Sequence, residues 1–131
     1  MTRDGPFWAA ALAVASGAAI GALLRWGLAY WLNPRSGWLP LGTFAANTLG
    51  GLLCGLALGW TAASPALPPA VRLFVITGFL GGLTTFSTFS GEAFSLISSG
   101  EILRGAAHVF LHTAASLTAT WLGFLLWKHF L

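Results

Sequence analysis

Long apolar runs dominate the sequence, and short turn-forming segments separate them. The first run covers about residues 7–32 and ends at an Asn-Pro-Arg-Ser-Gly segment that favours a turn. The remaining runs cover about residues 41–63, 70–97 and 102–127. A helix that crosses a bilayer needs about 20 mostly apolar residues. The pattern therefore predicts an all-α membrane protein with four transmembrane helices in a single transmembrane domain over residues 1–131.

The third run contains a segment that disfavours a continuous helix. Two adjacent glycines at 81–82 are followed by five hydroxyl residues between positions 84 and 90. We therefore expect a break near residues 81–85. Backbone freed from helical bonding at membrane depth must be buried in protein, or line a polar cavity or an ion site. A kink whose polar groups are satisfied by neighbouring helices is the alternative.

Basic residues are almost evenly divided between the two predicted sides of the membrane. One side carries Arg3, Arg72 and Lys128, and the other carries Arg35 and Arg104, with Arg25 slightly inside. Orientation in the membrane is set by an excess of Lys and Arg on one side. A chain with so small an excess can insert both ways, and two opposite copies can then pair. The count leaves open the alternative that one extra charge fixes a single orientation.

Glycines recur at helical spacing in the first two runs. Gly51, Gly55 and Gly59 follow one another at intervals of four, and Gly17 and Gly21 repeat the pattern. Small residues at this spacing let helix backbones approach closely in lipid. The pattern fits packing within one subunit and packing against a second copy equally well.

Composition supports lipid as the solvent. Hydrophobic residues make up 56% of the chain and charged residues only 7%, whereas soluble domains carry roughly a quarter charged residues. The basic residues are too sparse for a nucleic-acid interface. Cys54 is the single cysteine, which excludes an intramolecular disulfide. No nucleophile, base and orienting group can be assembled, so we do not expect an enzyme.

Several polar residues within the predicted helices need a polar or buried environment. Asn47 and Thr43 lie one turn apart in the second helix. His108, His112, Ser116 and Thr120 form a stripe at intervals of four in the fourth helix. Both groups fit hydrogen bonding between helices or a path for a solute. Phe86 and Phe89 share a face if the segment after the break is helical, and their electropositive ring edges can attract an anion; simple packing is the alternative.

The ionisable residues suggest further possibilities. His108 and His112 share one helix face, but no other Cys or His and no nearby carboxylate completes a metal site in the sequence, so we do not expect zinc. Glu92 suggests a proton-coupled transporter, unless its place toward the end of the helix leaves it solvated. Arg25 either extends to the membrane interface or attracts anions to a vestibule.

These motifs resemble those of the Fluc (CrcB) family of fluoride channels. The resemblance rests on Gly-Phe-Leu-Gly-Gly-Leu-Thr-Thr-Phe-Ser-Thr-Phe-Ser at 78–90, on Gly-Thr-Phe-Ala-Ala-Asn at 42–47 and on Arg25. It covers essentially the whole chain. It implies a dual-topology, antiparallel homodimer in a prokaryotic plasma membrane, which passively exports fluoride and lowers its cytoplasmic concentration.

The resemblance also implies roles for individual residues. The fluoride path would be formed by Asn47, Phe86, Phe89, Ser87, Thr88, Thr43, His112, Ser116 and Thr120. Arg25 would lie in the vestibule. Backbone carbonyls of Gly81 and Thr84 from both subunits would hold a structural Na⁺ at the dimer centre.

His108 and His112 depart from the Tyr and the small hydroxyl or alanine expected in many relatives. Because imidazole titrates near neutral pH, we predict a fluoride current that depends on pH. Two other functions compete with a channel. A proton-coupled small exporter would need a carboxylate deep in the first helix, which has none after Asp4. A helical adaptor without transport gives no reason for the broken third helix.

Overall fold

The computed structural model describes residues 6–130, and these residues are helical apart from short connections. Arg3 of the charge count and Asp4 lie outside this range. Four helical stretches are long and apolar enough to cross a membrane. The predicted all-α architecture with four candidate spans is thus confirmed, and the chain is a multi-pass membrane protein.

Three of the four stretches are continuous or nearly so. Helix α1 spans Phe7–Leu32 and runs into a short 3₁₀ turn, Asn33–Arg35. Helix α2 spans Leu41–Ala63, and α6 spans Ile102–Phe130. Prolines at positions 6 and 40 directly precede α1 and α2, where a residue without an N–H is tolerated.

The third stretch consists of four pieces. Helix α3 (Pro69–Arg72) leads into a π-helix over Leu73–Leu80, followed by α4 (Gly81–Leu83) and, after an interruption, α5 (Phe86–Ser98). The break falls at residues 84 and 85, inside the predicted range, and is confirmed. Gly100 then turns the chain toward α6 with a φ of 87°, a conformation that glycine adopts without steric penalty.

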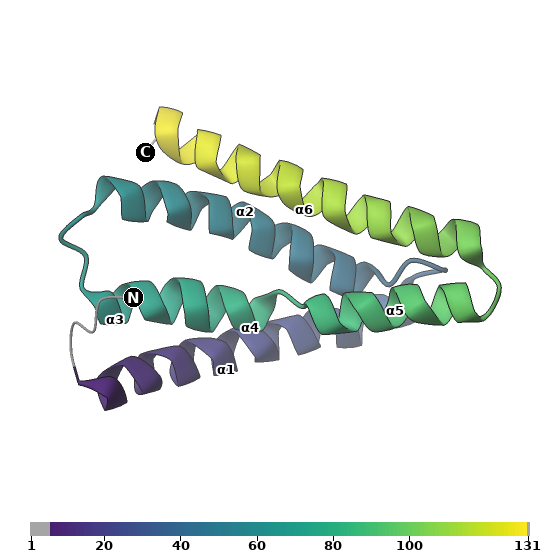
Figure 1. Ribbon diagram of the computed structural model, residues 1–131, viewed down its shortest axis with the longest axis horizontal. Helices are drawn as coiled ribbons and strands as arrows, with labels where there is room; N and C mark the ends of the chain where they lie inside the picture. Colours follow the sequence, from purple (N-terminus) through teal and green to yellow (C-terminus); the bar gives the residue numbers. More distant parts are fainter. Residues whose placement is uncertain (1–5, 131) are drawn as a thin grey trace.

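The helices associate as two close pairs. Helix α6 lies along α2, and the broken third stretch lies along α1, while α5 also flanks the first part of α6 (Figure 1). A Cβ at Gly55 would lie 2.0 Å from the Thr120 carbonyl oxygen, and one at Gly21 would lie 2.1 Å from the Phe79 carbonyl oxygen. Both glycine patterns therefore serve packing within one chain, which decides between the two interpretations.

The buried apolar set is small, as expected for a protein whose solvent is lipid. It consists of Ala46, Ala57, Leu80, Leu83, Ala93 and Ala119. Large apolar side chains instead point outward from every span; Trp8, Leu23, Phe110 and Trp121 are all more than 60% exposed. Water would penalise this distribution, whereas hydrocarbon accommodates it.

Candidate functional site

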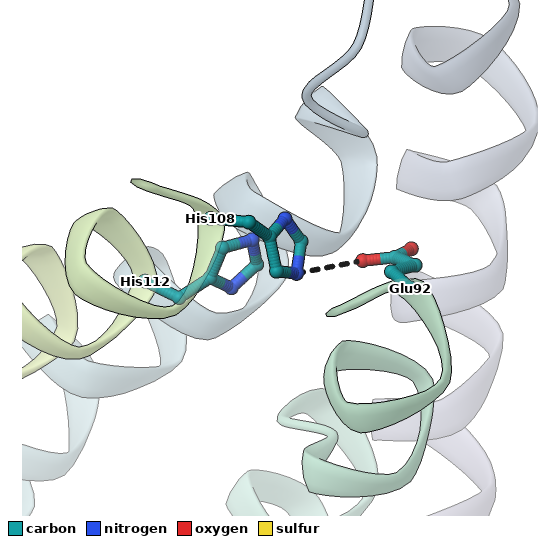
Figure 2. Close-up of side chains that lie close together, drawn as sticks. All are labelled: Glu92, His108 and His112. Atoms are coloured by element: carbon teal, nitrogen blue, oxygen red, sulfur yellow. Dashed lines mark ion pairs between the residues drawn. The ribbon is translucent and has the colours of Figure 1, made fainter. Parts of the chain in front are cut away.

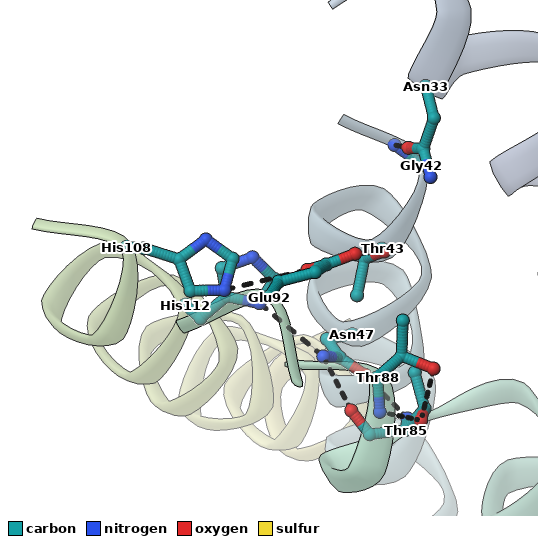
Figure 3. Close-up of polar contacts among 9 residues, drawn as sticks. All are labelled: Asn33, Gly42, Thr43, Asn47, Thr85, Thr88, Glu92, His108 and His112. Carbon is teal, nitrogen blue, oxygen red and sulfur yellow. Dashed lines mark hydrogen bonds and ion pairs between the residues drawn. The ribbon is translucent and has the colours of Figure 1, made fainter. Parts of the chain in front are cut away.

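Asn47 holds the backbone of Thr85 at the break in the third stretch. At Thr84 and Thr85 the backbone becomes extended, with ψ of 154° and 119°. The Thr85 N–H donates to Asn47 Oδ1 at 2.7 Å, and Asn47 Nδ2 donates to the Thr85 carbonyl at 3.1 Å (Figure 3). One side-chain amide thus satisfies both backbone groups of Thr85, as burial in a membrane requires.

Two further backbone groups near the break are held by side chains. Thr85 Oγ1 accepts from the Thr88 N–H and caps α5. Arg25 Nε donates to the Gly82 carbonyl at 2.9 Å. In a continuous helix the Thr85 N–H would bond the Gly81 carbonyl, but here it is diverted to Asn47, so Gly81 loses that donor.

A cavity of about 550 Å³ opens beside the break, between α2, the third stretch and α6. Six residues of the predicted fluoride path line it: Asn47, Phe86, Phe89, His112, Ser116 and Thr120. Gly81 and Thr84, the residues predicted to bind Na⁺, line it as well. Sequence positions up to 73 residues apart thus meet at one place because α2 and α6 pack closely along their glycine face.

The other predicted path residues lie outside the lining of this cavity. Thr43 is buried and donates from Oγ1 to Glu92 Oε1 at 2.6 Å. Ser87 and Thr88 are exposed in the first turn of α5, where both hydroxyls contact Thr85 Oγ1. Arg25 makes the Gly82 contact described above instead of extending freely. The predicted roles of these residues remain predictions.

The two phenylalanines have different surroundings. Their ring centroids lie 5.5 Å apart. Phe89 is enclosed by the imidazoles of His108 and His112, with centroid distances of 5.4 and 5.2 Å. Phe86 is 79% exposed. Phe89 is therefore held by this chain, whereas the Phe86 ring projects from it.

Glu92 contacts the histidine pair, which the sequence interpretation missed. Its Oε2 lies 3.5 Å from His108 Nε2, and His108 is fully buried (Figure 2). The suggestions that Glu92 is solvated and that no carboxylate lies near the histidines were therefore wrong. A signal was present, because Glu92 and His108 each stand eight residues from Gly100. A tight turn between antiparallel helices brings such positions side by side.

Comparison with known proteins identifies the family. The profile of a family described as "CrcB-like protein, Camphor Resistance (CrcB)" matches residues 12–124. The chain belongs to the CrcB family. The resemblance inferred from the motifs is thus confirmed.

Individual relatives of this chain carry the name of a fluoride channel. It is 58% identical over 113 residues to a protein of Thiobacillus denitrificans named "Fluoride-specific ion channel FluC", covering 86% of this chain and 91% of the relative. A protein of the same name from Psychrobacter cryohalolentis is 57% identical over 118 residues, covering 89% and 95%. One from Ralstonia pickettii is 55% identical over 113 residues, covering 86% and 90%.

Proposed function

We propose that this protein is a fluoride-selective channel, not an enzyme, that lets fluoride leave the cytoplasm passively and so lowers its concentration there. The observation that carries the proposal is the 58% identity, over most of both chains, to a relative named as a fluoride-specific ion channel. The relatives named above are bacterial, which supports a plasma-membrane location. Four apolar spans supply the required embedding in the bilayer.

The cavity offers suitable groups for a small, strongly hydrated anion. A pore must replace the water around an ion while binding it weakly enough to release it. The amide of Asn47 and the hydroxyls of Ser116 and Thr120 are donors, and the rings of Phe86 and Phe89 present electropositive edges. The second N–H of Asn47 makes only a 3.4 Å contact with His112 Nδ1, a weak interaction that an anion can displace.

A second copy of the chain would complete the path. Ser87, Thr88 and Phe86 are exposed together on the first turn of α5. Hydroxyls facing lipid are unfavourable, so this face is better covered by protein. An antiparallel partner would bring these side chains into the path. Thr43 would remain bonded to Glu92, and Arg25 would lie near the vestibule. Balanced loop charges support the two orientations that such a homodimer needs.

The break also supplies groups that suit a structural Na⁺. Carbonyl oxygens are appropriate ligands for a small hard cation, and irregular backbone makes them available. Gly81 has lost its helical donor, and both Gly81 and Thr84 border the cavity. We propose that their carbonyls, with those of the partner, hold Na⁺ at the dimer centre. When bound, the ion would contribute a fixed positive potential there.

Fluoride efflux from liposomes tests the function. We expect rapid fluoride release down its gradient, little chloride release under the same conditions, and no need for a proton gradient. A strict proton requirement would favour the exporter. Absence of release from well-folded protein would favour an adaptor and contradict the proposal.

A further inference from the structure

Three ionisable side chains from two helices converge beside the cavity. Glu92 of α5 and His108 and His112 of α6 place one potential ligand atom each within 4.8 Å of one another (Figure 2). The two histidines are four residues apart and share one face of α6. Their ring centroids lie 4.3 Å apart. The cluster is therefore built on helices and not on a loop.

The polar atoms of this cluster are buried without sufficient partners. His108 is 0% and His112 3% exposed. Within residues 6–130, both ring nitrogens of His108, Nε2 of His112 and Oε2 of Glu92 are buried and make no hydrogen bond. Nearly all buried polar atoms in proteins have a partner, and a bound water or ion is one of the explanations for an exception. One ligand atom from each of the three residues lies within 4.8 Å of the other two, so a single occupant can contact all three residues.

We propose that Glu92, His108 and His112 form a binding site for a divalent transition-metal ion, with Zn²⁺ as its best probe. Imidazole nitrogens and carboxylate oxygens are common ligands of such ions. In a tetrahedral site with bonds of about 2.0–2.1 Å, neighbouring ligand atoms are about 3.3 Å apart. Rotations of the Glu92 and histidine side chains close the remaining gap of at most about 1.5 Å.

The surroundings of the cluster suit such a site. Thr43 Oγ1 donates to Glu92 Oε1 at 2.6 Å, which orients the carboxylate and leaves Oε2 for the ion. A hydrogen bond of this kind to a ligand is typical of metal sites. Three protein ligands leave a coordination position open for water. The ion's two positive charges would also compensate a carboxylate that is otherwise unfavourable at membrane depth.

Zinc at this site would act on the proposed fluoride path, and this part rests on the proposed function. His112 borders the cavity and contacts both Phe89 and Asn47. A divalent cation there would hold fluoride instead of releasing it. If His112 binds through Nε2, its proton moves to Nδ1 and the contact from Asn47 Nδ2 is lost. We therefore expect Zn²⁺ to inhibit fluoride flux.

Equilibrium binding of Zn²⁺ to the purified, chelator-stripped protein tests the site directly. We expect about one ion per chain, and an absorption band of tetrahedral Co²⁺ when Co²⁺ replaces Zn²⁺. The variants Glu92→Gln, His108→Gln and His112→Gln should each weaken binding by more than about 100-fold, beyond the range seen for residues that only orient a ligand. His129→Gln is the matched control, because His129 is exposed near the end of α6. Size-exclusion profiles identify variants that fail to fold.

The outcomes separate the site from the proposed function. Wild-type protein that passes fluoride but binds no Zn²⁺ would overturn the metal site and leave the channel intact. Equal binding by wild type and a well-folded His112→Gln variant would overturn it too. Stoichiometric binding without fluoride flux would support the site and contradict the function. Zn²⁺ inhibition should appear in wild type and in His129→Gln.

Discussion

At the scale of single residues, Asn47 makes the break in the third stretch possible. Its amide both accepts from and donates to the Thr85 backbone. A side-chain amide donates from its nitrogen and accepts at its oxygen, two atoms held in one plane, whereas a hydroxyl has a single oxygen for both roles. Asn47 also borders the cavity, so it couples the shape of the third helix to the proposed fluoride path.

Replacing Asn47 by leucine, which has a similar size, should destabilise the protein. The change leaves the Thr85 N–H and carbonyl unpaired in a part-buried position, and each such group costs about 1–3 kcal/mol. We expect the free energy of unfolding, measured by denaturant titration in mixed micelles, to fall by at least about 1 kcal/mol. Thr118→Val at an exposed position of α6 should change it by less than about 0.5 kcal/mol. Equal effects of the two substitutions would show that the amide does not support the break.

At the scale of helices, two glycine faces determine which elements pair. Helix α6 lies on the face formed by Gly51, Gly55 and Gly59 of α2. The π-helix and α4 lie on Gly17 and Gly21 of α1. The π-helix over Leu73–Leu80 has i→i+5 hydrogen bonds in place of the i→i+4 bonds of an α-helix, and such segments are frequent at functional sites. The first pair fixes the separation of α2 and α6, which both line the cavity.

Glycine-to-alanine substitutions distinguish this packing from mere helix propensity. An alanine Cβ at Gly55 would lie 2.0 Å from the Thr120 carbonyl oxygen, so α2 and α6 must separate. We expect a loss of stability of about 1–3 kcal/mol. A Cβ at Gly27 would meet nothing within 4 Å, and Gly27→Ala should be neutral or stabilise by up to about 1 kcal/mol. Thermal unfolding of both variants measures the two changes in stability. Similar losses of stability in Gly55→Ala and Gly27→Ala would contradict the packing account.

At the scale of the whole molecule, one chain leaves its proposed path incomplete. The cavity is open, and Phe86 with the hydroxyls beside it projects from α5. A protein surface with this chemistry is better covered by a second copy than by lipid. An antiparallel arrangement requires that the chain enter the membrane in both orientations.

Cysteine labelling tests the two orientations. Ser99 is exposed and uncharged in the turn between α5 and α6, so Ser99→Cys in a Cys54→Ser background leaves the charge balance unchanged. A membrane-impermeant thiol reagent added to intact cells should label about half of the copies, because the charge bias is so small. Permeabilised cells provide the value for complete labelling. Labelling of all copies or of none in intact cells would establish a single orientation.

Local sequence patterns predicted much of this structure, and contacts between helices explain the remainder. Apolar runs gave the four spans, and the glycines followed by hydroxyl residues gave the break, because both features act locally. The partner of the Gly51 pattern and the placement of Glu92 depend on which helices meet, and no local pattern encodes that. The π-helix was not predicted, since its residues resemble those of an ordinary apolar helix. Among the candidate path residues, the fold brings Asn47, Phe89 and His112 together at the cavity, whereas Thr43 lies outside its lining and donates to Glu92.

Fluoride efflux from liposomes, comparing Phe86→Ile with wild type, tests the central claim most directly. Isoleucine keeps an apolar side chain but removes the electropositive ring edge. Phe94→Ile is the matched control, because Phe94 is similarly exposed on the same helix and does not line the cavity. We predict that Phe86→Ile slows fluoride release by at least about tenfold and that Phe94→Ile leaves it unchanged. Undiminished fluoride release through a well-folded Phe86→Ile variant would contradict the proposed path.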